Sequence, residues 1–112
     1  VIHTHTAATL AVATMKEGLL PLTQQSMRFT NRIAYHDYEG VYFTDDERRR
    51  LQASLGHRDV MLLRNHGTLA CGRTISEAFD VIYYLERACQ AQVSLLTLGR
   101  ELVQPPIADS GG

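Results

Sequence analysis

The chain has 112 residues, which is enough for one domain with a real hydrophobic core. Apolar residues make up 45% of it and charged residues 21%, which is typical of a globular protein and argues against disorder. The net charge of −1 gives no basic excess, so we expect no nucleic-acid partner and no membrane surface. No signal peptide and no apolar run of the roughly 20 residues of a membrane span is visible, which favours a cytoplasmic location.

The N-terminal segment is expected to be a strand that leads into a helix. Residues 1–4, Val-Ile-His-Thr, carry no polar lead-in and no capping signal, which predicts the end of a strand and a longer polypeptide upstream. A helix is predicted over residues 6–16, begun by a threonine and ended by Gly18. Because its residues are small or apolar on nearly every side, this helix should be buried all round.

The next part of the chain has weaker signals. Residues 19–22 contain Pro21 and should be irregular. Residues 24–31 are ambiguous and could form one or two helical turns. The segments 32–36 and 41–43 are rich in β-branched and aromatic residues, so a hairpin-like pair is expected there.

A second helix is predicted to start at a capping box. Thr44 and Glu47 have the spacing of that motif. Acids fill the first turn and Arg48–Arg50 follow, which complements the helix dipole. We expect these arginines to form a solvated face rather than a phosphate site. Leu51 and Leu55 lie four residues apart and should face the core.

The C-terminal half is predicted to form two strands and a long helix. Residues 59–63 form a continuous apolar run, the pattern of a strand covered on both faces, and residues 68–71 resume as a short strand. A capping box at Thr74–Glu77 opens a helix that reaches about Leu98. Its expected core stripe has helical spacing and consists of Ala78, Ile82, Leu85, Cys89, Val93 and Leu96.

These elements predict an α/β or α+β protein with a mixed sheet covered by helices. Residues 1–104 should form one folded unit and residues 105–112 a flexible tail. The two cysteines, Cys71 and Cys89, are too few for a disulfide framework, so we expect both to be reduced and buried, with a single bridge as the alternative.

The candidate functional residues are three histidines. In a strand, residues i and i+2 project from one face, so His3 and His5 could aim both imidazoles at one point. His66 follows another strand and precedes a glycine. Three neutral imidazoles suit zinc and leave a fourth position open for water or substrate.

The simpler interpretation is that His-x-His is a pair of surface histidines on an exposed strand, and the third histidine strengthens the metal interpretation. Of the other two histidines, His57 should be exposed. His36 should be an ordinary hydrogen-bonding loop residue, with a second-shell or substrate-side role as the alternative. Cys71 is favoured as a small buried residue over a metal ligand.

Four motifs in this order resemble the class II aldolase/adducin family. They are Val1-Ile2-His3-Thr4-His5-Thr6, Gly18-Leu19-Leu20-Pro21, Tyr35-His36-Asp37-Tyr38-Glu39-Gly40 and Leu63-Arg64-Asn65-His66-Gly67. The resemblance covers about residues 1–100, and the middle two motifs are more similar to the adducin-like branch than to the sugar-phosphate aldolases. The chain is therefore expected to be the C-terminal half of such a domain.

The resemblance implies a three-layer α/β/α sandwich around a mixed, largely antiparallel sheet. It also implies that His3, His5 and His66 bind Zn²⁺ or another divalent metal. The implied chemistry is that of an aldehyde-lyase or epimerase acting on a small sugar phosphate or ketose through a zinc-stabilised enediolate. The proton-transfer acid of such enzymes is expected upstream of Val1, and a homo-oligomer, as in the family's tetramers, is implied as well.

The resemblance leaves one alternative open. A non-catalytic, adducin-like binding or oligomerisation module could keep the metal-site histidines, because a shared fold does not establish an activity.

Overall fold

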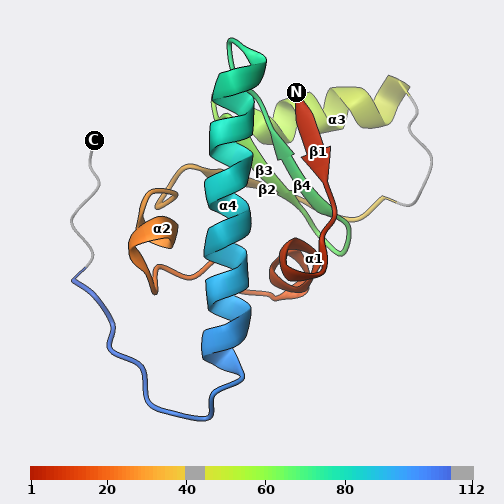
Figure 1. The fold of residues 1–112 in the computed structure, drawn as a ribbon. Coiled ribbons are helices and arrows are strands. Elements are labelled where there is room, and N and C mark those ends of the chain that lie inside the picture. Colours follow the sequence, from red (N-terminus) through yellow and green to blue (C-terminus); the bar gives the residue numbers. More distant parts are fainter. Residues whose placement is uncertain (40–44, 107–112) are drawn as a thin grey trace.

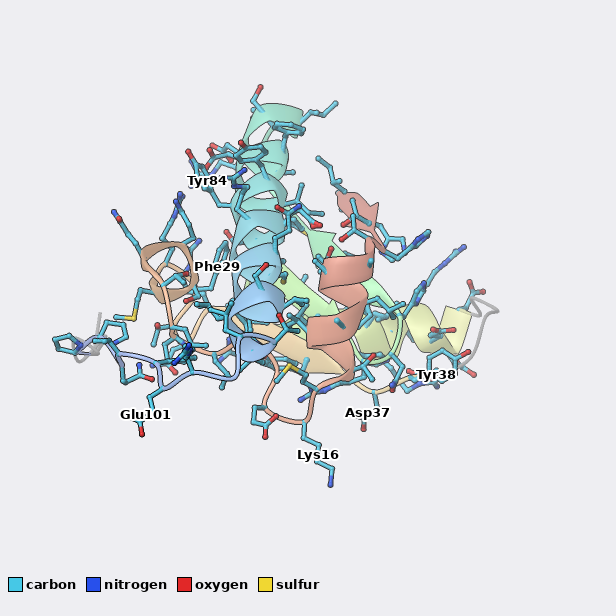
Figure 2. All side chains as sticks on the ribbon, turned by 60° about the horizontal axis from the view of Figure 1, so that its bottom comes forward. Lys16, Phe29, Asp37, Tyr38, Tyr84 and Glu101 are labelled. Carbon is cyan, nitrogen blue, oxygen red and sulfur yellow. The ribbon has the colours of Figure 1, made fainter. Side chains whose placement is uncertain are left out.

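The computed structural model describes residues 1–39 and 45–106, so the segment 41–43, Thr44 and most of the tail 105–112 lie outside the described residues. Within these described ranges, four strands and four helices follow one another (Figure 1). In chain order they are β1 (Ile2–Thr4), α1 (Ala7–Thr14), α2 (Gln24–Met27), β2 (Ile33–His36), α3 (Asp45–Leu55), β3 (Val60–Leu63), β4 (Gly67–Ala70) and α4 (Ile75–Leu96).

The strands form one mixed sheet with the order β1-β4-β3-β2. β4 runs antiparallel to both of its neighbours, and β2 runs parallel to β3. The register places His3 opposite Leu69 on one side of β4 and Leu63 opposite Gly67 on the other. The expected mixed, largely antiparallel sheet is confirmed, and β2 has its described partner in β3.

Helices cover both faces of this sheet, because β3 is apolar on both. Val60 and Leu62 join a cluster with residues of α1 and α4, and Met61 and Leu63 join a second cluster with residues of α3. All four are buried, as the continuous apolar run predicted. Figure 1 shows α4 and α1 on one side of the sheet and α3 on the other. The α/β class is therefore confirmed, and the layers are helix, sheet and helix.

Helix α1 is less buried than its composition suggests. Thr6 caps it, its hydroxyl accepting a hydrogen bond from the backbone N–H of Thr9. Val12 and Ala13 are buried against the core, but Leu10 is 40% exposed. The expectation of a helix buried all round is wrong, because α1 packs with only one face against α4 and the sheet. Small side chains on that face allow the close approach.

Helix α4 is the longest element and starts as predicted. The hydroxyl of Thr74 accepts a hydrogen bond from the N–H of Glu77, whose carboxylate accepts one from the N–H of Arg73. Most of the expected stripe is buried or half-buried, but Leu96 is 45% exposed and does not belong to the core. The last turn of α4 extends beyond the sheet, which explains this exposure (Figure 1).

Both cysteines are free, but only one is buried. Burial raises the pKa of the Cys89 thiol to about 12, so this side chain stays protonated and acts as a small apolar residue. Cys71 is partly exposed at the end of β4, so the expectation that both thiols are buried is wrong for this one. Among the described helices, none is long and apolar enough to cross a membrane.

Candidate metal centre

Three imidazole rings gather where β1 ends and the turn between β3 and β4 begins. The ring centroids of His3 and His5 are 5.4 Å apart, those of His3 and His66 are 4.9 Å apart, and those of His5 and His66 are 6.0 Å apart. Strand pairing explains this convergence. Thr4 pairs with Thr68, so the end of β1 lies beside the first residues of β4, next to His66.

The turn that carries His66 is built for close contact with β1. Asn65 adopts a left-handed conformation with φ 61°, which asparagine tolerates better than most residues. A Cβ atom on Gly67 would lie 2.3 Å from the carbonyl oxygen of Thr4 and 2.9 Å from the Cβ of His5. Only glycine therefore allows the two segments to approach so closely.

The number, type and spacing of these side chains fit a metal ion. Imidazoles bound tetrahedrally to one zinc at about 2.1 Å have ring centroids about 5 Å apart, close to the observed separations. The Nδ1 of His3 lies 2.7 Å from the carbonyl oxygen of Thr68, an acceptor, so the neutral ring has its proton on Nδ1 and its lone pair on Nε2.

The rings of His5 and His66 are nearly parallel, with an interplanar angle of 21°. Over residues 1–39 and 45–106, no three histidine, cysteine, aspartate or glutamate side chains have their ligating atoms arranged to hold a metal. Binding of one ion by all three rings would therefore require these side chains to reorient.

The environment of His66 favours the neutral imidazole. Burial lowers the pKa of His66, the nearby His3 and His5 lower it further, and Glu47 acts in the opposite direction. A metal competes with protons for the same nitrogen, so a lowered pKa keeps His66 available to a metal at a more acidic pH than an ordinary histidine.

This shift predicts a pH-dependent stability for the metal-free protein. The folded-state pKa of His66 lies below the unfolded value of about 6.5, so its stabilising contribution is complete above that pH. The contribution is lost as the pH falls through the lower folded-state pKa. Proton NMR of the His66 ring during a pH titration should place its midpoint below that of a histidine in a model peptide. A midpoint at or above the peptide value would contradict the prediction.

Arg64 joins the His66 turn to the helix that follows His5. Its guanidinium donates hydrogen bonds to the carbonyl oxygens of Met15, at 2.6 Å, and Lys16, at 3.3 Å, just beyond the end of α1. The guanidinium carbon also lies 4.4 Å from the ring centroid of Tyr35. Arg64 therefore connects the His66 turn to the end of α1, the helix that begins after His5.

We expect Arg64→Lys to destabilise the folded protein by about 2 kcal/mol, because lysine cannot make the forked contact and the ring stacking together. Chemical denaturation would measure this change. The matched control is Arg48→Lys, at a side chain that is 68% exposed, where a change below about 0.5 kcal/mol is expected. Equal effects of the two substitutions would show that Arg64 has no special role.

The remaining charged candidates form a separate network. His36 contacts the Ser54 hydroxyl at 2.7 Å and the Glu39 carboxylate, which also pairs with Arg50. The Arg50 guanidinium lowers the pKa of the Glu39 carboxyl, and the bond to His36 adds to this effect. His36 is thus a buried strand-end residue with both ring nitrogens engaged, and not the loop residue expected. His57 is exposed, as predicted.

Two residues near the site were missed in the sequence. Glu47 was identified only as the second member of a capping box, but its side chain is 7% exposed and it lines a small cavity with His66. Arg64 stands inside the fourth motif and received no role, because its partners are carbonyl groups 48 and 49 residues earlier in the chain. In the sequence, its position beside Asn65-His66-Gly67 is the one feature that could have indicated a role for Arg64 near the site.

Comparison with known proteins identifies the family of this chain. The sequence profile described as "Class II Aldolase and Adducin N-terminal domain" matches residues 1–93. A Pseudomonas aeruginosa protein, provisionally named a class 2 aldolase, is 47% identical over 95% of this chain and 41% of its own length. Human gamma-adducin is 46% identical over 86% of this chain and 14% of its own length. The chain thus spans about two fifths of the first of these relatives.

Solved structures place the fold in the same group. A crystal structure of an aldolase II superfamily protein from Pseudomonas syringae superposes with a TM-score of 0.89, at 46% identity, over 94% of this chain and 43% of that one. L-fuculose 1-phosphate aldolase from Glaciozyma antarctica superposes with a TM-score of 0.74, at 26% identity, over 93% of this chain and 38% of that one. From its sequence and its fold, the chain belongs to the class II aldolase and adducin N-terminal domain family.

Proposed function

We propose that this chain carries the metal centre of a divalent-metal-dependent lyase or epimerase that acts on a small sugar phosphate or related ketose. The observation that supports this most directly is the convergence of His3, His5 and His66 from two distant segments, with ring centroids 4.9–6.0 Å apart. The similarity to an L-fuculose 1-phosphate aldolase supports the substrate class.

In this proposal the three histidines hold one divalent ion, with zinc as the first choice because its preferred sites use imidazole nitrogen. When bound, such an ion supplies a Lewis acid for the carbonyl and hydroxyl oxygens of a substrate. The Thr68 carbonyl fixes the tautomer of His3, and the lowered pKa of His66 keeps that ring neutral. Three neutral ligands do not reduce the positive charge of the bound ion, and they leave one of its coordination positions open.

The proposal is tested on the full-length protein. Elemental analysis should find about one divalent ion per chain, and the metal-loaded protein should cleave L-fuculose 1-phosphate or a related ketose phosphate into an aldehyde and dihydroxyacetone phosphate. Treatment with a chelator should remove the activity, and zinc should restore it. A protein without bound metal, or with metal but without turnover on a panel of ketose phosphates, would contradict this function.

A second candidate is a non-catalytic binding or oligomerisation module of the adducin type. The observation in its favour is that the chain is 46% identical to gamma-adducin but 26% identical to the fuculose phosphate aldolase. This candidate predicts self-association, measurable by analytical ultracentrifugation, without turnover. Detection of retro-aldol cleavage would exclude it.

A further inference from the structure

A small cavity lies between the His66 turn and α3. It is lined by His66 and by side chains from the end of β2, from the segment after it and from α3, among them His36, Glu47 and Leu51. Its volume is about 10 Å³, which is about the space that one water molecule requires. The cavity is too small for a substrate, so its importance lies in the side chains around it.

Glu47 is the unusual member of this lining. The first turn of α3 carries three acids, and the side chains of Asp45 and Asp46 are 86% and 76% exposed. Glu47 is 7% exposed. The helix dipole is satisfied by exposed acids, so it does not explain why one of the three is buried. A buried carboxylate is costly unless positive charge or hydrogen-bond donors surround it.

The charge of Glu47 acts on His66. Glu47 and His66 line the same cavity of about 10 Å³, so the carboxylate lies close to the imidazole ring. Its negative charge therefore favours positive charge at His66. The same electrostatic attraction would favour a divalent ion bound to the other side of that ring.

The neighbouring charged groups have partners within their own network. His36 is engaged by Ser54 and Glu39, and Glu39 also binds Arg50. These contacts fix the segment after β2 to α3. The bond to Glu39 is the main cause that raises the pKa of Arg50, and Glu47 contributes to it, so Glu47 acts on this arginine of α3 as well as sharing the cavity with His66.

We propose that Glu47 is a positioning residue of the metal centre, which would hold the His66 ring in the orientation that binds the ion, directly or through the one water that the cavity admits. Histidine ligands commonly donate their second N–H to a carboxylate or water, which fixes the tautomer and raises the basicity of the ligating nitrogen. This inference rests on the metal centre proposed above, and it assigns a role to a residue outside the three histidines.

A capping role for Glu47 is compatible with this one, because a carboxylate has acceptor sites for more than one partner. The two roles can be separated by the choice of substitution. Glutamine serves as well as glutamate at this capping-box position, so Glu47→Gln keeps the capping ability and removes the charge. The matched control is Asp46→Asn, which removes an exposed charge from the same helical turn.

The test uses the full-length protein and its Glu47→Gln, Glu47→Asp and Asp46→Asn variants. Zinc affinity is measured by competition with a chromogenic chelator, and the visible spectrum of bound Co²⁺ reports ligand geometry. We expect Glu47→Gln to weaken zinc binding about 10- to 100-fold and to change the Co²⁺ spectrum. Asp46→Asn should do neither. Denaturation of the metal-free Gln variant should remain within about 1 kcal/mol of wild type, since glutamine has the same size and the same capping preference as glutamate.

Three outcomes would overturn the inference. The first is a Gln variant whose zinc affinity is within twofold of wild type and whose Co²⁺ spectrum is unchanged. The second is an equal loss of affinity in Asp46→Asn, which would show a general charge effect. The third outcome applies if the Gln variant does not fold and the Asp variant replaces it. In Glu47→Asp the carboxylate is one methylene further from His66. Wild-type zinc affinity and a wild-type Co²⁺ spectrum in this variant would contradict the role.

The outcome for the wild-type protein distinguishes this inference from the proposed function. If wild type binds zinc in a manner that depends on His66 and Glu47→Gln binds equally well, only the role of Glu47 fails. If wild type binds no zinc, or binds it equally well without His66, the metal centre and the role of Glu47 fail together.

Discussion

His66→Ala is expected to weaken zinc binding by more than about 100-fold in the full-length protein, because loss of a second-shell partner alone costs about 10- to 100-fold. The two remaining imidazoles, on His3 and His5, would be too few to hold the ion in its usual coordination. Chelator competition measures the affinity. A thermal scan adds a second measure, because added zinc should raise the melting temperature of wild type but not of the variant.

The matched control for this substitution is His57→Ala, since His57 is an exposed histidine outside the centre. It should bind zinc as wild type does. The His66 ring is only partly buried, so the metal-free His66→Ala protein should fold normally. Equal zinc affinity in the two variants would remove His66 from the centre.

Gly67→Ala is expected to destabilise the protein by about 2–4 kcal/mol, which is the upper part of the range for overpacking. The new Cβ would lie 2.3 Å from the Thr4 carbonyl oxygen and 2.9 Å from the His5 Cβ. Both neighbours are held by the chain and cannot rotate away, so β1 would have to separate from β4. Zinc affinity should therefore fall together with stability, because His5 moves with the strand.

Gly56→Ala provides the control for this prediction. Gly56 has φ 58°, and a Cβ there would meet nothing within 4 Å. Its substitution should cost about 1 kcal/mol through backbone conformation alone and should leave zinc affinity unchanged. Chemical denaturation and chelator competition on both variants give the comparison. A Gly67→Ala protein as stable as Gly56→Ala would show that the close approach to β1 is not required.

Local patterns in the sequence were enough to predict most of the elements. The capping threonines Thr6 and Thr74 and the apolar run of β3 predicted two helix starts and one doubly covered strand correctly. The periodicity of α4 identified its buried face but failed at Leu96, because periodicity does not show where the sheet beneath a helix ends. For the same reason, composition alone did not show that one side of α1 is exposed.

The candidate site was predicted in part. The His-x-His spacing and the position of His66 after a strand predicted three neighbouring rings, and the ring separations confirm that proximity. The identity of these residues as metal ligands stays a prediction. Arg64 and Glu47 could not be found in this way, because their partners are set by how α1 and α3 pack on the sheet. Such long-range contacts leave no periodic signal in a single sequence.

The position of β1 at the margin of the described sheet has a consequence for how the centre would respond to its ion. Two of the three imidazoles come from β1 or the residue after it, and β4 is its partner among the described strands. A marginal strand frays more readily than the interior β3, so its amide protons should exchange with solvent sooner. An ion bound by His3, His5 and His66 would link that strand to the turn that carries His66. Adding the metal should therefore slow deuterium uptake at Ile2–Thr4.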